Sequence, residues 1–191
     1  MNALTLNLDT VNLTDDQFYE LCRRNQNFRF ERTQTGELIV MPPVGGESGR
    51  READFITDLG IWNRHTNLGI VFSSSTVFKL PNGANRSPDA AWIQRQRWDA
   101  LTPIQRRKFP AIAPDFVIEL RSATDDLQDL QDKMQEYLDN GVQLGWLINP
   151  QDQRVEIYRF RRPVEVLNLP SDLSGEDTLP EFVLKLNLFS D

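Results

Sequence analysis

The segment from Pro114 to Asn149 constrains the fold most, because it combines two short apolar runs with an amphipathic stretch between them. The first run, F-V-I-E-L at 116–120, is too short for a helix and rich enough in β-branched residues to predict a buried strand. Glu119 is unusual in such a strand. An unpaired charge buried there costs several kcal/mol unless a cation or a hydrogen-bond donor meets it.

The amphipathic stretch predicts a helix that can bring a cation to Glu119. Asp125-Asp126 is a typical N-terminal cap, and Asn140-Gly141 is a typical end. At about 100° per residue, Lys133 falls on the border of the apolar stripe, so its ammonium can reach over the sheet. The stripe itself consists of Leu127, Leu130, Met134, Tyr137 and Leu138.

The second apolar run, at 144–148, predicts another buried strand, which makes the unit a strand, helix and strand with a right-handed crossover. A capping box at Thr14 and Gln17 begins a helix that runs to about Asn25. A glycine-rich segment at 45–49 leads into a long helix that ends near residue 66. The inward stripe of that long helix is predicted at Ala53, Ile56, Leu59, Gly60 and Asn63, widened by Phe55 and Trp62.

Further strands are expected from β-branched and alternating runs bounded by turn residues. They are predicted at 28–32, 38–41, 69–73, 76–80, 86–93, 154–160 and 164–167, with short helical turns between 98 and 108. These elements predict an α/β protein of the mixed α+β kind, in which helices flank a mixed β-sheet.

Composition fits one globular domain over residues 1–191, since 39% of the 191 residues are hydrophobic and 26% are charged. We expect a cytoplasmic protein, because the N-terminal residues lack the features of a secretory signal and no run is long enough to span a membrane. The single cysteine, Cys22, excludes an internal disulfide and a cysteine-rich zinc site.

The net charge of −7 disfavours a protein that coats nucleic acid without sequence preference, but it does not exclude an enzyme that acts on it. Five basic residues in one stretch could face phosphates, or they could form a solvated loop and short helix. These residues are Arg95, Arg97, Arg106, Arg107 and Lys108.

The candidates for chemistry are Asp89, Glu119 and either Lys133 or Arg121. Two carboxylates at neighbouring strand ends can bind Mg²⁺ or Mn²⁺, and a nearby lysine can orient or deprotonate an attacking water. Glu47 and Glu52 are further candidate ligands, although the helix dipole alone also favours acids there. An aspartate after proline, as at Asp89, is also a common turn residue.

Four motifs in this order resemble the Uma-two family of endonucleases, which is abundant in cyanobacteria and belongs to the PD-(D/E)-x-K restriction-endonuclease-like superfamily. The resemblance covers roughly residues 14 to 186. The motifs are R-S-P-D-A-A-W from Arg86, P-D-F-V-I-E-L-R-S from Pro114, K-M-Q-E-Y-L-D-N-G-V from Lys133 and G-W-L-I-N-P from Gly145.

The resemblance implies that Asp89 supplies the first acid of the superfamily motif and Glu119 the second. The superfamily lysine would fall two residues later, where this chain has Arg121; the resemblance implies that Lys133 replaces it from the following helix. Arginine is a poor base and a good phosphate clamp, so Lys133 is assigned to the water and Arg121 to the phosphate. The resemblance leaves Glu47 and Glu52 as alternatives for a further ligand.

The sequence therefore predicts a Mg²⁺-dependent DNA endonuclease, with Mn²⁺ as a possible substitute. A homodimer is expected, because cutting two strands requires two sites. The rival hypotheses are a catalytically silent relative that uses the fold for binding or assembly, and a metal-dependent phosphohydrolase that acts on small nucleotides.

Overall fold

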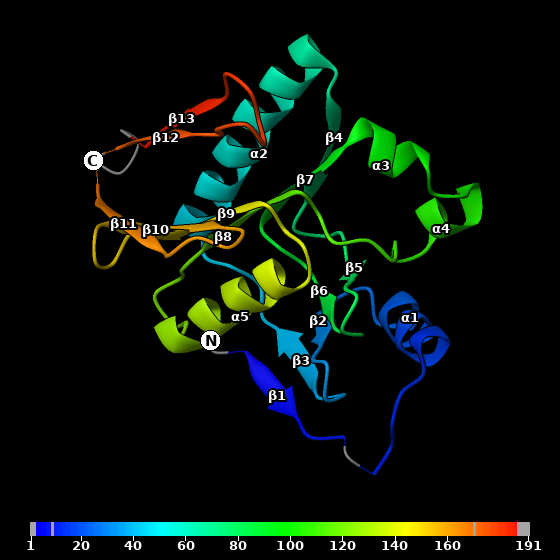
Figure 1. Ribbon diagram of the computed structural model, residues 1–191. Coiled ribbons are helices and arrows are strands. Elements are labelled where there is room, and N and C mark those ends of the chain that lie inside the picture. The colour runs from blue at the N-terminus through cyan, green and yellow to red at the C-terminus, as the bar shows by residue number, and fades with distance from the viewer. Residues whose placement is uncertain (1–2, 9, 170, 187–191) are drawn as a thin grey trace.

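The computed structural model describes residues 3–8, 10–169 and 171–186, and its centre is a six-stranded mixed sheet (Figure 1). Only β8 and β9 are parallel, whereas every other neighbouring pair in this sheet is antiparallel. The predicted mixed sheet is therefore confirmed. From edge to edge, its strands are β11 (Glu165–Asn168), β10 (Arg154–Arg159), β9 (Leu144–Asn149), β8 (Phe116–Leu120), β7 (Ala90–Gln94) and β4 (Gly69–Ser73).

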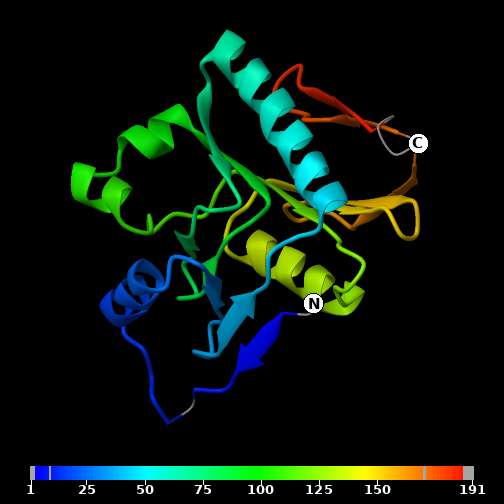
Figure 2. The ribbon, with the colours of Figure 1, turned by 180° about the vertical axis from the view of Figure 1, so that it is seen from behind.

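Two helices cover opposite faces of this sheet (Figures 1 and 2). On one face, α2 (Gly46–Thr66) packs Phe55 and Leu59 against the even-numbered side chains of β8. On the other face, α5 (Leu127–Asp139) packs Met134 and Tyr137 in the cluster that contains Val117. The alternation of side chains along β8 thus places Glu119 on the α5 face.

The predicted strand, helix and strand unit is present. Asp126 is the N-cap of α5, and its side chain accepts hydrogen bonds from the N–H groups of Gln128 and Asp129. Because β8 and β9 are parallel, α5 is the crossover between them.

A second, five-stranded sheet lies below the central sheet in Figure 1 and is flanked by α1 (Asp15–Arg24). The capping box predicted at Thr14 and Gln17 is formed at the start of α1. The sequence analysis predicts no strand at residues 4–6, which form the first strand of this sheet. In spatial order they are β1 (Leu4–Leu6), β3 (Leu38–Met41), β2 (Arg29–Arg32), β6 (Asn85–Arg86) and β5 (Phe78–Lys79).

Shorter elements complete the fold. The helical turns expected between 98 and 108 are α3 (Arg95–Asp99) and α4 (Pro103–Arg107), and Thr102 caps the second of them. A two-stranded sheet of β12 (Asp172–Ser174) and β13 (Val183–Lys185) packs against α2, with Leu173 and Leu184 in the same core cluster. Among the described helices, none has the length and apolar character needed to cross a membrane.

The strand predicted at 86–93 is wrong in one respect, because it is split into β6 and β7, which belong to different sheets. The segment between them is Ser87-Pro88-Asp89, and the proline has no N–H to offer to a continuous ladder. The chain therefore passes from one sheet to the other immediately before Asp89.

The inward face predicted for the long helix is confirmed at Phe55 and Leu59 and is wrong at Ala53. Most of the glycine-rich segment predicted to precede the helix lies within α2, which begins at Gly46 and has Gly45 as its N-cap. Ala53 is exposed, whereas Glu52, Phe55 and Leu59 are buried. Glu52 lies three residues before Phe55 and seven before Leu59, so it shares their inward face.

Candidate active site

Two acids meet where β7 begins and β8 ends. Ala90 pairs with Ile118 in the antiparallel ladder, so Asp89 lies beside Glu119. The Leu120 N–H donates a 2.8 Å hydrogen bond to Asp89 Oδ2, which fixes this carboxylate at the strand end. The structure therefore brings these two predicted site residues together.

Lys133 completes this group from α5. Its Nζ lies 2.9 Å from Glu119 Oε1, and Glu119 itself is only 3% exposed. The Tyr137 hydroxyl donates to the same Oε1 atom at 2.9 Å. Lys133 and Tyr137 are four residues apart on one face of α5, so the helix delivers both donors to the buried acid.

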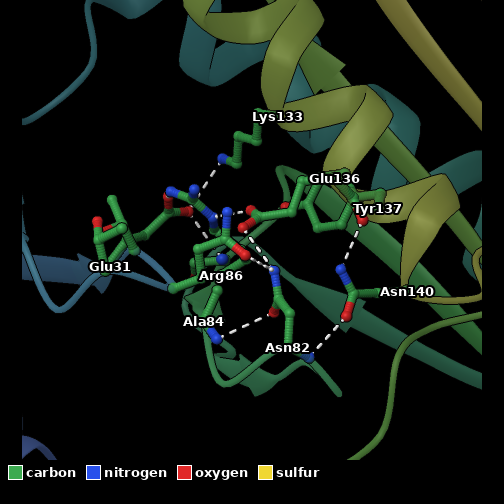
Figure 3. A network of polar contacts seen from close by, with 12 residues as sticks. Glu31, Asn82, Ala84, Arg86, Lys133, Glu136, Tyr137 and Asn140 are labelled. Atoms are coloured by element: carbon green, nitrogen blue, oxygen red, sulfur yellow. Dashed lines mark hydrogen bonds and ion pairs between the residues drawn. The ribbon is translucent and has the colours of Figure 1, made fainter.

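Glu31, on β2, is a part of the site that the sequence interpretation missed. Its Oε1 lies 2.9 Å from Lys133 Nζ, and Arg86 Nη1 lies 3.1 Å from its Oε2 (Figure 3). Arg86 also donates from Nε to Glu136 on α5. The only sequence signal was that β2, R-F-E-R, carries charge on both faces, so that packing either face inward buries a charged side chain.

Glu52 and Glu47, which the sequence left as alternatives, occupy different environments. Glu52 is buried, accepts a 3.3 Å hydrogen bond from Ser74 Oγ and lines the same cleft as Asp89. The Glu47 side chain is 68% exposed, forms ion pairs with neighbouring arginines of α2 and is not among the cleft residues. The geometry favours Glu52 as the helix acid of the site.

Arg121 is not brought to this group. Its guanidinium turns toward the β9–β10 turn, with Nη1 3.2 Å from Asp152 Oδ2 and 3.4 Å from Asn149 Oδ1. Arg121 is not among the residues that line the cleft. The structure therefore provides no support for Arg121 as a phosphate clamp beside Asp89 and Glu119.

The site opens into a cleft of about 1460 Å³ between α5, the β2–β3 hairpin and the start of α2. Three basic side chains line it, Arg29, Arg86 and Lys133, against eleven carboxylates. In the described part of the chain, no group of three or more His, Cys, Asp or Glu side chains is arranged to hold a metal ion. The cleft is thus acidic, with its buried cations already paired with acids.

Burial and repulsion by neighbouring acids raise the pKa of both central acids. Burial, followed by the charge of Glu52, raises the pKa of Asp89 to about 7. Burial, opposed by Lys133 and reinforced by Asp89 and Glu31, raises the pKa of Glu119 to about 8. The pKa of Glu52 is also raised, mainly by burial. Near neutral pH this acid group therefore retains protons that ordinary carboxyls would have lost.

The pKa values of Lys133 and Glu31 shift in the directions that favour their charged forms. Burial opposes the charge of Lys133, but Glu119 and Glu31 outweigh it and hold the pKa of Lys133 above its ordinary value. Burial likewise opposes the charge of Glu31, but Lys133 and Arg86 hold the pKa of Glu31 below its usual range. Lys133 is therefore an ammonium and Glu31 a carboxylate at neutral pH.

These shifts predict how the metal-free protein responds to pH. Between about pH 5.5 and pH 8.5, the folded state holds more protons than the unfolded chain on Asp89 and Glu119, whose ordinary values are 3.8 and 4.5. We expect these two groups to lower the free energy of unfolding as the pH rises, by about 1.4 kcal/mol per pH unit for each extra proton held. Thermal unfolding of wild type and Asp89→Asn across this range tests the expectation. A decline equally steep in both proteins would contradict it.

The predicted basic strip lies on α3, on α4 and at Lys108, which caps α4, and four of its members, all outside the cleft-lining residues, form local contacts. Arg97 pairs with Asp115, Arg106 with Asp99 and Lys108 with Asp16, while Arg95 donates to Asn67. These contacts agree with a solvated surface rather than with a free phosphate-binding strip.

Comparison with known proteins agrees with this architecture. Residues 15–187 match the model of the Uma2 family, which is described as "Putative restriction endonuclease". The fold is similar to a crystal structure of "a putative nuclease belonging to DUF820" from Anabaena variabilis ATCC 29413, with a TM-score of 0.76 and 21% sequence identity. The similarity covers 93% of this chain and 97% of that chain. No curated protein matches this chain. Since the family model spans nearly the whole sequence, including Glu31, Glu52, Asp89, Glu119 and Lys133, this chain belongs to the Uma2 family.

Proposed function

We propose that this protein is a Mg²⁺-dependent DNA endonuclease whose centre is formed by Asp89, Glu119 and Lys133. The observation that carries the proposal is a pair of neighbouring acids with raised pKa, beside a buried ammonium, in a large cleft. Carboxyls in a cleft whose pKa is strongly raised by burial and by a specific charged neighbour are candidates for functional sites. The family description points to the same class of reaction.

The donor set fits a hard divalent cation. In the described part of the chain, Asp89 Oδ1 and Glu119 Oε2 accept no hydrogen bond, while the other oxygen of each acid is held in place. Mg²⁺ is commonly held by one or two carboxylates together with water, so Asp89 and Glu119 would hold it, with Glu52 as a further acid in the same cleft. When bound, the ion would polarise the phosphodiester and lower the pKa of a coordinated water.

Lys133 acts as a donor in this proposal and not as a base. Because its pKa is held above the ordinary value of 10.5, it carries a proton that it cannot give up readily at neutral pH. Its ammonium can orient the attacking water and stabilise the negative charge that develops on the phosphate. This refines the sequence-based alternative in which the lysine removes a proton from water.

The acidic lining of the cleft supports a cation requirement for substrate binding as well. A phosphate backbone that approaches eleven carboxylates is repelled unless positive charge is added to the site. We therefore expect DNA to bind weakly in EDTA and more tightly in Ca²⁺, which brings the charge to the same hard oxygen ligands.

Cleavage of supercoiled plasmid tests the proposed function directly. We expect nicked and linear products with Mg²⁺ or Mn²⁺, none in EDTA, and none from Asp89→Asn in either metal, because the variant retains the acceptor for Leu120 N–H but loses the charge. Equal cleavage by wild type and Asp89→Asn would show that a different site, or a contaminating nuclease, is responsible.

A homodimer remains part of the proposal, since double-strand cleavage with one centre per chain requires two chains. The measurement is the molar mass in solution at micromolar concentration, with and without DNA. If the protein is a monomer in both conditions, the proposed enzyme is one that nicks a single strand.

One observation favours a second candidate, a catalytically silent member of the fold. Glu119 Oε1 is already satisfied by Lys133 and Tyr137, as a purely structural buried acid would be. Under this alternative, wild-type protein cuts no plasmid in any metal, and Glu119→Gln lowers the melting temperature.

A further inference from the structure

Glu31 is a buried acid for which the proposed chemistry has no direct use. It is 2% exposed and accepts from three donors, one on α5 and two at the end of β6. Its Oε1 lies 2.9 Å from Lys133 Nζ and accepts a 2.8 Å hydrogen bond from the Ser87 N–H. Its Oε2 accepts a 3.1 Å hydrogen bond from Arg86 Nη1 (Figure 3). An acid that is this fully bonded is held rigidly.

These contacts join the two sheets to the helix between them. Glu31 belongs to the five-stranded sheet, Glu119 to the six-stranded sheet and Lys133 to α5. The ammonium of Lys133 thus forms an ion pair with one acid of each sheet, and both N–O distances are 2.9 Å. Ser87, which Glu31 also fixes, stands two residues before Asp89.

A second layer fixes Glu31 itself. Arg86 donates from Nε to Glu136 Oε2 at 2.5 Å, three residues after Lys133 on α5. Glu136 also accepts from Asn82 at 2.9 Å, and Asn140 accepts from the Asn82 N–H at 2.8 Å. The chain of contacts visible in Figure 3 therefore holds α5 against the β2 and β6 strands, so that Glu31 and Lys133 keep a fixed relation.

We propose that Glu31 is a positioning residue that keeps the Lys133 ammonium over the Asp89 and Glu119 pair while Glu119 is engaged with a cation. This inference rests on the proposed function. A cation on Glu119 repels the ammonium, which has the same sign of charge, and weakens its bond to that acid. Glu31 contacts the same ammonium from the other sheet and is not one of the proposed ligands, so it supplies the contact that remains.

The first test combines kinetics with a spectroscopic signature of Lys133 in the full chain. The chain has four lysines, and the Lys133 side chain is 12% exposed, against 36% for Lys79 and 52% for Lys108, so its ammonium protons should exchange slowly enough to observe by ¹H–¹⁵N NMR. The signal is assigned by its loss in Lys133→Arg. With saturating Mg²⁺ at one fixed pH near neutrality, we expect wild type to keep this signal and Glu31→Gln to lose it.

In the same Mg²⁺ buffer, Glu31→Gln should lower kcat for plasmid cleavage roughly 10–100-fold with KM within about twofold, as for other residues that orient a catalytic group. Glu165→Gln is the matched control, since it removes a carboxylate paired with Arg159 at 2.8 Å outside the cleft. It should retain both the Lys133 signal and the wild-type kcat.

An unchanged Lys133 signal or an unchanged kcat in Glu31→Gln overturns the inference. If Glu31→Gln does not fold, Glu31→Asp decides the question, because it keeps the charge but withdraws it by one methylene: a lowered kcat with normal KM supports positioning, and wild-type kcat refutes it. An inactive wild type refutes the proposed function instead, and the NMR comparison then still reports whether Glu31 holds Lys133.

Discussion

Glu119→Gln should abolish metal binding and cleavage together. The variant keeps an oxygen that can accept from the Tyr137 hydroxyl, and Lys133 retains Glu31, so the fold keeps its main contacts around this residue. What it loses is the charge that a divalent cation requires. We expect no detectable plasmid cleavage and no saturable Mn²⁺ binding by calorimetry.

Two further Glu→Gln changes serve as matched controls. Glu47→Gln, at an exposed position outside the cleft, should leave cleavage unchanged. Glu52→Gln, at the cleft, should weaken metal binding without abolishing it, since it removes one negative charge near the ion while Asp89 and Glu119 remain as ligands.

The melting temperature of metal-free Glu119→Gln near pH 8.5 should equal or exceed that of wild type, because the raised pKa of Glu119 shows that its charge is unfavourable there. Retained cleavage with a lowered melting temperature would establish Glu119 as a structural residue.

Lys133→Ala should separate catalysis from metal binding. We expect cleavage to slow by roughly 10²–10⁴-fold, the range for a group that assists proton movement or stabilises charge in the transition state. Metal affinity near pH 8 should be retained, since the variant removes a competing positive charge from Glu119 and no ligand of the ion. Isothermal titration with Mn²⁺ and plasmid kinetics measure the two effects independently.

Lys133→Ala should also destabilise the metal-free fold. Removing one partner of a buried ion pair costs about 3–5 kcal/mol, because Glu31 and Glu119 are left facing each other with less compensation. Mg²⁺ should therefore raise the melting temperature of Lys133→Ala more than that of wild type. Lys185→Ala, at an exposed position of β13, is the control that should change neither property. A Lys133→Ala protein that cuts at the wild-type rate would remove Lys133 from the mechanism.

Local patterns predicted most of the central architecture because they reflect local physics. The buried strand at 116–120, the capped helix after it and the parallel strand that follows were all visible as changes of hydrophobic period and as capping residues. Glu119 was recognisable as a site residue for the same reason, since a charge in a buried strand requires a partner.

The remaining features depend on long-range packing that no local pattern contains. Glu31 lies 88 positions before Glu119 in the sequence, and the two meet only because β2 belongs to a second sheet that α5 joins to the first. Glu52 lies on the same helix face as Phe55 and Leu59, but only the packing of Phe55 against the sheet shows that this face is buried and that Glu52 reaches the cleft. Arg121 lies outside the cleft because its guanidinium pairs with Asp152 in the β9–β10 turn, a contact that the sequence alone does not reveal.

The central claim is that Asp89 and Glu119 form a cation site in the acidic cleft, and calorimetric titration of Mn²⁺ into metal-free protein tests it most directly. Near pH 7, we predict saturable binding of about one Mn²⁺ per chain, accompanied by release of roughly one to two protons, because the raised pKa values of both acids mean that the cation displaces protons. Asp89→Asn should show neither effect. Absence of saturable binding to wild type, or equal binding by wild type and Asp89→Asn, would contradict the account.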